Sequence, residues 1–192
     1  MLTRELIQRT FTKLPTLDTE RLQLRQILPT DTEDMFAYAS KKEVTRYLLW
    51  SPHPTRAYTE KYIAYLQERY RAGDFYDWAV VLKDTGRMVG TCGFTKFDVS
   101  SNSAEVGYVL SPSVWGQGYA TEALTAVLRF GFQKLHLHRA EACYLEENTA
   151  SRRVMERAGM KFEGIRRDSI IVKGHYRNVG VCSVLSEEFS SP

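Results

Sequence analysis

The sequence is poor in the residues that mark disulfide-rich, fibrous or disordered chains. Its 192 residues include 3 cysteines, 6 prolines and 12 glycines, which excludes a disulfide scaffold, a collagen-like repeat and a low-complexity chain. No run approaches the ~18–20 apolar residues that a membrane-spanning helix needs, and the first residues do not have the apolar core of a signal peptide. We therefore expect a cytoplasmic protein with no membrane partner.

The sequence also has only a small excess of charge of one sign. The 26 Lys and Arg against 23 Asp and Glu leave a net charge of +3, and no block of five like charges concentrates it, so no nucleic-acid partner is expected. A hydrophobic content of 43% and a charged content of 26% are typical of one globular domain with a sizeable core. We expect an N-terminal extension over residues 1–14 and one domain over residues 15–188.

Metal-binding and thiol motifs are missing. Cys92, Cys143 and Cys182 are far apart, and each lies in an apolar stretch typical of a strand. Without a Cys-x-x-Cys pair or a neighbouring histidine, small buried side chains explain them better than a nucleophile or a metal site. The four histidines also lack metal-ligand spacing: His53, His136, His138 and His175. We predict no metal site.

Hydrophobic periodicity predicts a mixture of strands and helices. Alternating residues predict strands at 21–27, 77–83, 88–97, 104–110 and 140–145, and two more around the Lys173-Gly174 turn. Helical spacing predicts helices at 29–40, 41–49 and 55–72, another after Gly118, and one at 148–158 that ends at Gly159. Because several strands are joined by hairpins, the fold class is α+β, with a mixed, mostly antiparallel sheet flanked by helices.

Gly116-Gln117-Gly118 lies between a predicted strand and a predicted helix. The first N–H groups of a helix have no helical partner and lie at its positive end, and glycine lets an anion approach them. A phosphate or pyrophosphate is the expected ligand, although two glycines before a helix also form purely structural turns. A phosphate-loop NTPase is excluded because no Gly-Lys-Ser/Thr follows, and hairpin-linked strands disfavour a dinucleotide-binding fold.

Six segments follow one another in a characteristic order: 19–25, 104–110, 115–123, 138–141, 147–151 and Ala158-Gly159-Met160. Together they resemble the GNAT superfamily of acyl-CoA-dependent N-acyltransferases. The likeness extends over about residues 15–188 and is closest to the RimJ/RimL-type branch, whose founding members acetylate the N-termini of ribosomal proteins.

The resemblance implies acetyl-CoA as co-substrate and a splayed strand at its binding site. Residues implied to bind it are Tyr108, Val109 and Leu110 on that strand, Gly116, Gln117, Gly118, Tyr119, Ala120 and Thr121 around the glycine turn, and Asn148. Two positions depart from the superfamily pattern. Trp115 stands where Arg or Gln usually begins the pyrophosphate signature, and Met155 stands where a tyrosine often protonates the leaving thiolate.

Transfer of an acetyl group to an amine needs a proton acceptor, oxyanion donors and a proton for the thiolate. We predict Glu105 as the proton acceptor, although a single glutamate on a strand is also often a solvated surface residue. The resemblance implies backbone N–H groups near Val109 and Leu110 as oxyanion donors. Ser151 is the remaining hydroxyl for the thiolate, and Asn148 completes the catalytic set. Both residues also suit the structural role of a helix start.

The expected activity is transfer of an acetyl group from acetyl-CoA to a primary amine, directly within a ternary complex. A protein N-terminus, a small amine, an amino sugar and an antibiotic all remain candidate acceptors. A non-catalytic acyl-CoA-binding regulatory module and an unrelated phosphate-binding domain are the alternatives. The hypothesis for the acceptor groove uses the loop 47–53 and the hairpin 175–177, with Trp50, Tyr76 and Tyr176 as lining. The oligomeric state, monomer or homodimer, remains open.

Overall fold

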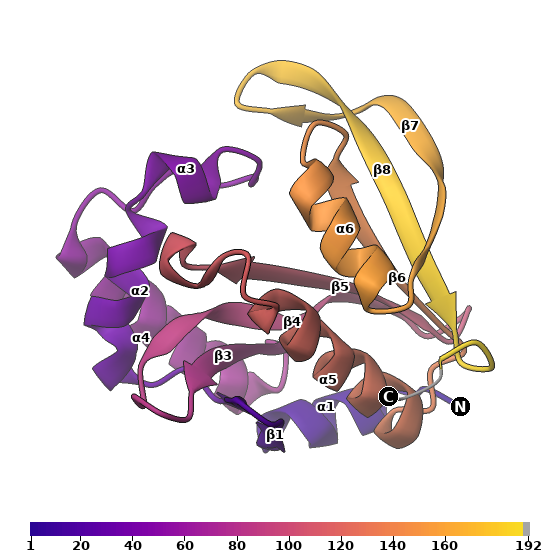
Figure 1. Cartoon of the computed structure of the whole chain (residues 1–192). Helices are drawn as coiled ribbons and strands as arrows, with labels where there is room; N and C mark the ends of the chain where they lie inside the picture. The colour runs from indigo at the N-terminus through magenta and orange to yellow at the C-terminus, as the bar shows by residue number, and fades with distance from the viewer. Residues whose placement is uncertain (190–192) are drawn as a thin grey trace.

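The computed structural model describes residues 1–189, and these contain one eight-stranded sheet with the order β1-β2-β3-β4-β5-β6-β8-β7 (Figure 1). The strands are β1 (Leu17–Asp18), β2 (Leu22–Arg25), β3 (Asp77–Leu82), β4 (Met88–Asp98), β5 (Ser103–Leu110), β6 (Arg139–Leu145), β7 (Lys161–Val172) and β8 (His175–Leu185). Within the described sheet every neighbouring pair is antiparallel except β5–β6. The expected mixed, mostly antiparallel α+β fold is confirmed.

Six α-helices and two short 3-10 helices accompany the sheet in this part of the chain. They are α1 (Arg4–Thr12), η1 (Pro29–Asp31), α2 (Thr32–Ala39), α3 (Lys42–Thr45), α4 (Arg56–Ala72), η2 (Pro112–Val114), α5 (Tyr119–Lys134) and α6 (Thr149–Arg157). The predicted helix at 41–49 is shorter than expected, and the chain beyond it forms a loop before α4. Among the described residues, no helix has both the length and the apolar character to cross a membrane.

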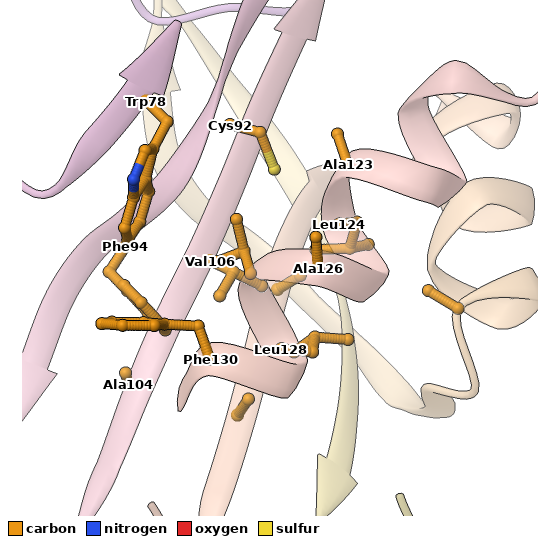
Figure 2. Close-up of a cluster of buried hydrophobic side chains, with 14 of the residues drawn as sticks. Trp78, Cys92, Phe94, Ala104, Val106, Ala123, Leu124, Ala126, Leu128 and Phe130 are labelled. Atoms are coloured by element: carbon orange, nitrogen blue, oxygen red, sulfur yellow. The ribbon is translucent and has the colours of Figure 1, made fainter. Parts of the chain in front are cut away.

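The central strands are buried on both faces because helices cover both. On β3, Trp78 and Val80 join the core beneath α5, and Ala79 and Val81 join a second core beneath α2 and α4. Figure 2 shows Trp78 and Phe94 from the sheet facing Phe130 and its neighbours on α5. Burial of each such large apolar side chain contributes roughly 1.5–3 kcal/mol. These two cores fix the sheet between two helical layers.

Residues 1–14 contain helix α1, whose N-cap Thr3 accepts a hydrogen bond from the backbone of Leu6. Ile7 and Phe11 on this helix are buried in the core shared with α5. The Phe11 ring packs edge-on against Trp78 at a centroid distance of 5.7 Å. The segment that the sequence separates from the domain therefore packs against it.

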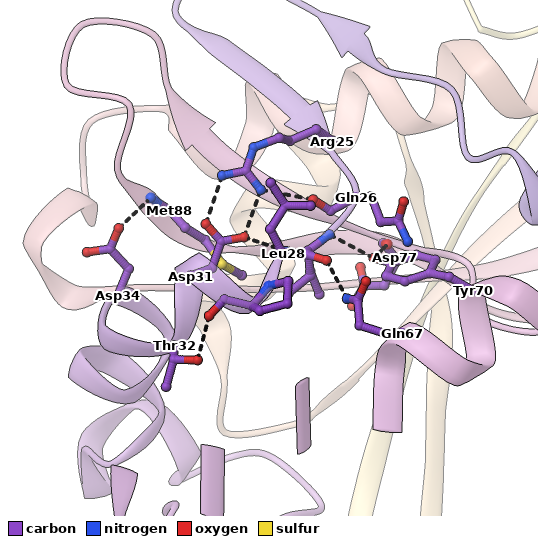
Figure 3. Close-up of polar contacts among 12 residues, drawn as sticks. Arg25, Gln26, Leu28, Asp31, Thr32, Asp34, Gln67, Tyr70, Asp77 and Met88 are labelled. Carbon is purple, nitrogen blue, oxygen red and sulfur yellow. Dashed lines mark hydrogen bonds and ion pairs between the residues drawn. The ribbon is translucent and has the colours of Figure 1, made fainter. Parts of the chain in front are cut away.

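A polar network joins β2, η1, α4 and β3 at the edge of the second core (Figure 3). Arg25 forms an ion pair of 2.7 Å with the buried Asp31. The Tyr70 hydroxyl accepts a hydrogen bond from the N–H of Ile27 and donates one of 2.7 Å to the carbonyl of Asp77. These bonds hold the start of β3 in place against α4.

The parallel pair of strands opens along its length. β5 and β6 pair only from Ser103 to Glu105 on β5 and from Arg139 to Glu141 on β6. Beyond that point β5 continues beside β4, while β6 continues beside β8. The splayed strand expected from the resemblance is thus formed by the second half of β5.

The hairpin of β7 and β8 extends past the sheet toward α3 (Figure 1). At its turn, the Nζ of Lys173 donates a hydrogen bond of 2.6 Å to the carbonyl of Thr45 at the end of α3. This contact joins the last hairpin of the chain to the loop that precedes α4.

Candidate active site

One cavity of about 740 Å³ lies over the opening between β5 and β6. Its wall includes residues from the face of the sheet beneath α2 and α4, from the splayed half of β5, from β6 and from α6. The lining residues include Tyr38, Trp50, His53, Tyr58, Tyr62, Phe75, Asp77, Thr91, Thr95, Glu105, Tyr108, Val109, Cys143, Asn148, Ser151 and Met155.

Glu105 lies in this wall just where the pairing of β5 with β6 ends. Its Oε1 accepts a hydrogen bond of 2.9 Å from the Thr95 hydroxyl on β4. Glu105 pairs with Glu141 on β6. A carboxylate oxygen of Glu105, one of Glu141 and the Sγ of Cys143 lie within 4.8 Å of one another. The carboxylate is therefore anchored by one donor and faces the cavity.

Tyr108 and Ser151 meet on the opposite side of the sheet. The Tyr108 hydroxyl donates to the carbonyl of Ser151 at 2.8 Å and lies 2.9 Å from the Ser151 hydroxyl. Burial raises the pKa of Tyr108 well above its usual range, so this hydroxyl keeps its proton. The sequence suggests only a backbone role for Tyr108 and gives no signal for this side-chain pair, which joins residues 43 positions apart.

Asn148 caps helix α6, as its residue type predicts. Its Oδ1 accepts a hydrogen bond of 3.3 Å from the N–H of Ser151. Asn148 also lines the cavity, which leaves its amide nitrogen available there. Met155 lines the same cavity and is buried, so an apolar side chain occupies the position at which the resemblance implies a tyrosine.

The glycine turn has the geometry expected of an anion-binding helix start. Gly116 and Gly118 have φ values of 75° and 85°, which glycine adopts without strain. A Cβ added at Gly116 would meet no atom within 4 Å. The N–H of Glu122 bonds to the carbonyl of Gly118, so the N–H groups of Tyr119, Ala120 and Thr121 precede the first helical partner.

Two residues outside the glycine turn fix its position. The Trp115 indole N–H donates to the Leu110 carbonyl at 2.8 Å, which removes this carbonyl from the free groups expected on the splayed strand. Arg21 donates to the carbonyl of Gln117 at 3.0 Å and forms an ion pair of 2.6 Å with Glu122. The sequence suggests a site without a cation because of Trp115, but the fold brings Arg21 to the start of α5.

The acceptor-groove hypothesis holds only in part. Trp50 and the rest of the loop 47–53 line the cavity. Tyr76 does not; its ring packs against Phe11 and Phe97 in the core beneath α5. Tyr176 on β8 is 68% exposed and lies outside the cavity wall. For Tyr76 the reason is strand parity, since successive side chains point to opposite faces of a sheet and its neighbour Asp77 lines the cavity. Sequence reasoning also did not find Asp77, which lines the cavity from β3.

The sheet order, the opened parallel pair and the glycine turn before α5 together define an acetyltransferase fold. In agreement, the structure of a GNAT-family acetyltransferase from Bacillus anthracis superposes with a TM-score of 0.81 at 30% identity, covering 91% of this chain and 100% of that chain. Residues 21–161 match the family described as "Acetyltransferase (GNAT) domain". The chain therefore belongs to the GNAT family of N-acetyltransferases, for which acetyl-CoA binding is typical.

Related sequences align with most of the chain. "Uncharacterized N-acetyltransferase p20" of Bacillus licheniformis is 33% identical over 177 residues, covering 92% of this chain and 99% of its own. The "[Ribosomal protein uS5]-alanine N-acetyltransferase" of Escherichia coli (strain K12) is 25% identical over 170 residues, covering 84% of this chain and 86% of its own. RimJ/RimL-type enzymes are thus among the homologues, as the motifs predict.

Proposed function

We propose that this N-acetyltransferase moves the acetyl group of acetyl-CoA directly to a primary amine while both are bound. The observation that supports this most is that one cavity contains Glu105 on one face of the sheet and the Tyr108–Ser151 pair on the other. The opening between β5 and β6 lies between them. A thioester reaching through that opening would meet an amine held beside Glu105.

The cavity residues have separate roles in the transfer. Glu105 takes a proton from the amine, directly or through a water, and the nitrogen then bonds to the carbonyl carbon. The N–H groups near Val109 and Leu110 stabilise the oxyanion, where each such donor contributes ~2.7–4 kcal/mol. When the carbon–sulfur bond breaks, the sulfur keeps the electron pair. The Ser151 hydroxyl, bonded to Tyr108, supplies its proton.

Coenzyme A binding is assigned to the glycine turn and the splayed strand. The N–H groups from Gln117 to Thr121 bind the pyrophosphate, and Gly116 leaves the space above them open. Arg21 adds positive charge, although Glu122 neutralises part of it. Tyr108 and Val109 contribute backbone groups to the pantetheine arm, and the amide nitrogen of Asn148 faces the same arm.

The acceptor is a primary amine, and relatives suggest where to look for it. The Escherichia coli relative is named for acetylating an alanine of ribosomal protein uS5, so a protein N-terminus is one candidate. Small amines, amino sugars and antibiotics are the others.

Thiol release from acetyl-CoA, measured across a panel of small amines and N-terminal peptides, tests the proposal. We expect thiol release above the rate of acetyl-CoA hydrolysis with at least one primary amine, together with formation of the acetylated amine. Binding of coenzyme A without release for any amine would instead indicate a regulatory module. No thermal stabilisation by coenzyme A would reject the assigned co-substrate, because a ligand at ~100 times its dissociation constant adds ~2.7 kcal/mol.

A further inference from the structure

We propose that the amine acceptor is a diamine or polyamine, with one amine acetylated beside Glu105 and a second ammonium group bound at Asp77. This inference rests on the proposed function, because it assigns the acceptor class of that same cavity. It depends on four features of the described cavity wall: a carboxylate oxygen without a partner, the absence of lysine and arginine, aromatic side chains, and the spacing of two acids.

One oxygen of the Asp77 carboxylate lacks a hydrogen-bond partner in the described part of the chain. This oxygen, Oδ1, is buried. The backbone carbonyl of Asp77 accepts a hydrogen bond from the Tyr70 hydroxyl (Figure 3). Gly93 on β4 leaves room for the side chain. A Cβ at Gly93 would lie 2.7 Å from this same Oδ1. The fold therefore makes space for a carboxylate whose hydrogen bonds it does not complete.

The cavity has negative charges and no positive ones among the described residues of its wall. Asp77 and Glu105 are its two acids, and no lysine or arginine lines it. Burial lowers the pKa of His53, so the imidazole is neutral near pH 7. Its Nδ1 is engaged with the Thr59 hydroxyl at 2.8 Å. A cationic acceptor is attracted to such a wall, and an anionic one is repelled.

Aromatic rings also contribute to the cavity wall. His53 packs against Trp50, Tyr58 and Tyr62 at centroid distances of 5.5, 4.9 and 5.5 Å. Burial, and secondarily the charge of Asp77, raises the pKa of Tyr62 to about 12. Aromatic faces attract ammonium groups within ~6 Å, most strongly where water is excluded. The rings thus add to the attraction that Asp77 exerts on a cation.

The two acids lie on one face of the sheet at a separation that suits a dication. Asp77 pairs with Gly93, and Gly93 pairs with Gly107. Glu105 precedes Gly107 by two positions, so its side chain points to the same face. With strands ~4.8 Å apart and a rise of ~3.4 Å per residue, the α-carbons of Asp77 and Glu105 are roughly 12 Å apart. A flexible chain between two amines can bridge the carboxylates.

Burial of Asp77 destabilises its ionised form in the folded protein, as is common for functional groups. It raises the pKa of this carboxyl to about 7, and the Thr91 hydroxyl and the Trp78 N–H offset only part of the effect. An acid whose ionised form destabilises the protein is a candidate for a ligand-binding role. A bound ammonium group would restore the ionised form.

The test compares α,ω-diamines of increasing length with n-alkylamines of the same carbon number, using acetyl-CoA-dependent thiol release. We expect kcat/KM to favour the diamine at the best length by about ten- to hundred-fold, mainly through KM. Asp77→Asn should abolish that preference. The exposed Asp84→Asn, in the turn between β3 and β4, should retain it. In parallel, the best diamine should raise the Tm of the complex with coenzyme A, and Asp77→Asn should remove this rise.

The outcomes separate this inference from the proposed function. If no amine is acetylated, the proposed function fails. If monoamines or N-terminal peptides are acetylated as well as diamines, or if Asp77→Asn keeps the preference, only the diamine assignment fails. Should Asp77→Asn not fold, the absence of a diamine preference in the unaltered chain would still overturn the inference.

Discussion

Glu105 and Asp77 are acids on the same face of the sheet, but their surroundings differ. Glu105 accepts a hydrogen bond from Thr95 at the edge of the β5–β6 opening. Asp77 lies deeper, with one oxygen unpartnered and with a raised pKa. Two carboxyls in unlike environments suit two tasks, since environment decides which group exchanges protons and which holds a charge.

Replacing Glu105 by glutamine should lower turnover without weakening acetyl-CoA binding. Loss of a general base typically lowers kcat by about a hundred-fold or more. Steady-state kinetics together with calorimetric binding of acetyl-CoA measures both quantities. Glu141→Gln is the matched control, because Glu141 lies beside Glu105 but outside the cavity wall, and it should change kcat far less. Unchanged activity of Glu105→Gln at every pH would reject Glu105 as the base.

At the scale of elements, the start of helix α5 is held by contacts that reach across the chain. Glu122 in its first turn accepts hydrogen bonds from Thr19 and from Arg21, both near the start of β2. The Arg21 guanidinium also lies 4.2 Å from the centre of the Tyr119 ring. Two of the segments that carry the family resemblance are therefore joined to each other, and they hold the glycine turn rigid.

Gly118→Val should weaken coenzyme A binding by at least about tenfold. The substitution puts a β-branched side chain at a φ of 85°, next to the N–H groups assigned to the pyrophosphate. Isothermal titration of coenzyme A checks this, with circular dichroism to confirm the fold. Gly174→Val carries similar backbone strain, at a φ of 83° in the β7–β8 turn, and should leave the affinity unchanged. Equal affinities for both variants would mean that the phosphate binds elsewhere.

At the scale of the whole molecule, the buried acid should govern how stability varies with pH. The pKa of Asp77 rises from 3.8 to about 7 on folding, so between these values the folded state binds more protons than the unfolded state. Stability should therefore fall as pH rises from about 4 to 7, by at most ~4 kcal/mol from this group. Tyr38, Tyr62 and Tyr70 face the same carboxyl and stay neutral throughout this range.

Asp77→Asn should remove this dependence of stability on pH, and the variant should be more stable than the unaltered chain at pH 8. At pH 4 the two should unfold at much closer urea concentrations, because Asp77 is then protonated in the folded state and only partly ionised in the unfolded state. Urea unfolding at both pH values measures the difference, and contributions from other groups cancel in the comparison. If the free energies of unfolding of the two proteins differ by the same amount at pH 4 and at pH 8, then ionisation of Asp77 does not destabilise the folded state.

Local sequence patterns suffice to define most of the helices and strands. Thr55 and Asn148 cap the helices that follow them, as their short polar side chains predict. Gly73 ends α4 at a φ of 71°, and the alternation over β2 and β3 marks both strands. These features depend on neighbours within a few residues, so they can be inferred without the fold.

Only part of the candidate site can be inferred from local sequence in the same way. The glycine turn is a local signal, and Glu105, Ser151 and the splayed strand followed from ordered motifs. The contacts of Arg21 with Glu122 and of Tyr108 with Ser151 join residues 101 and 43 positions apart, so only the packing of α5 and α6 on the sheet creates them. Likewise, Tyr76 and Asp77 are adjacent, and which of them faces the cavity depends on which helices cover each face of β3, because burial is a property of the assembled layers.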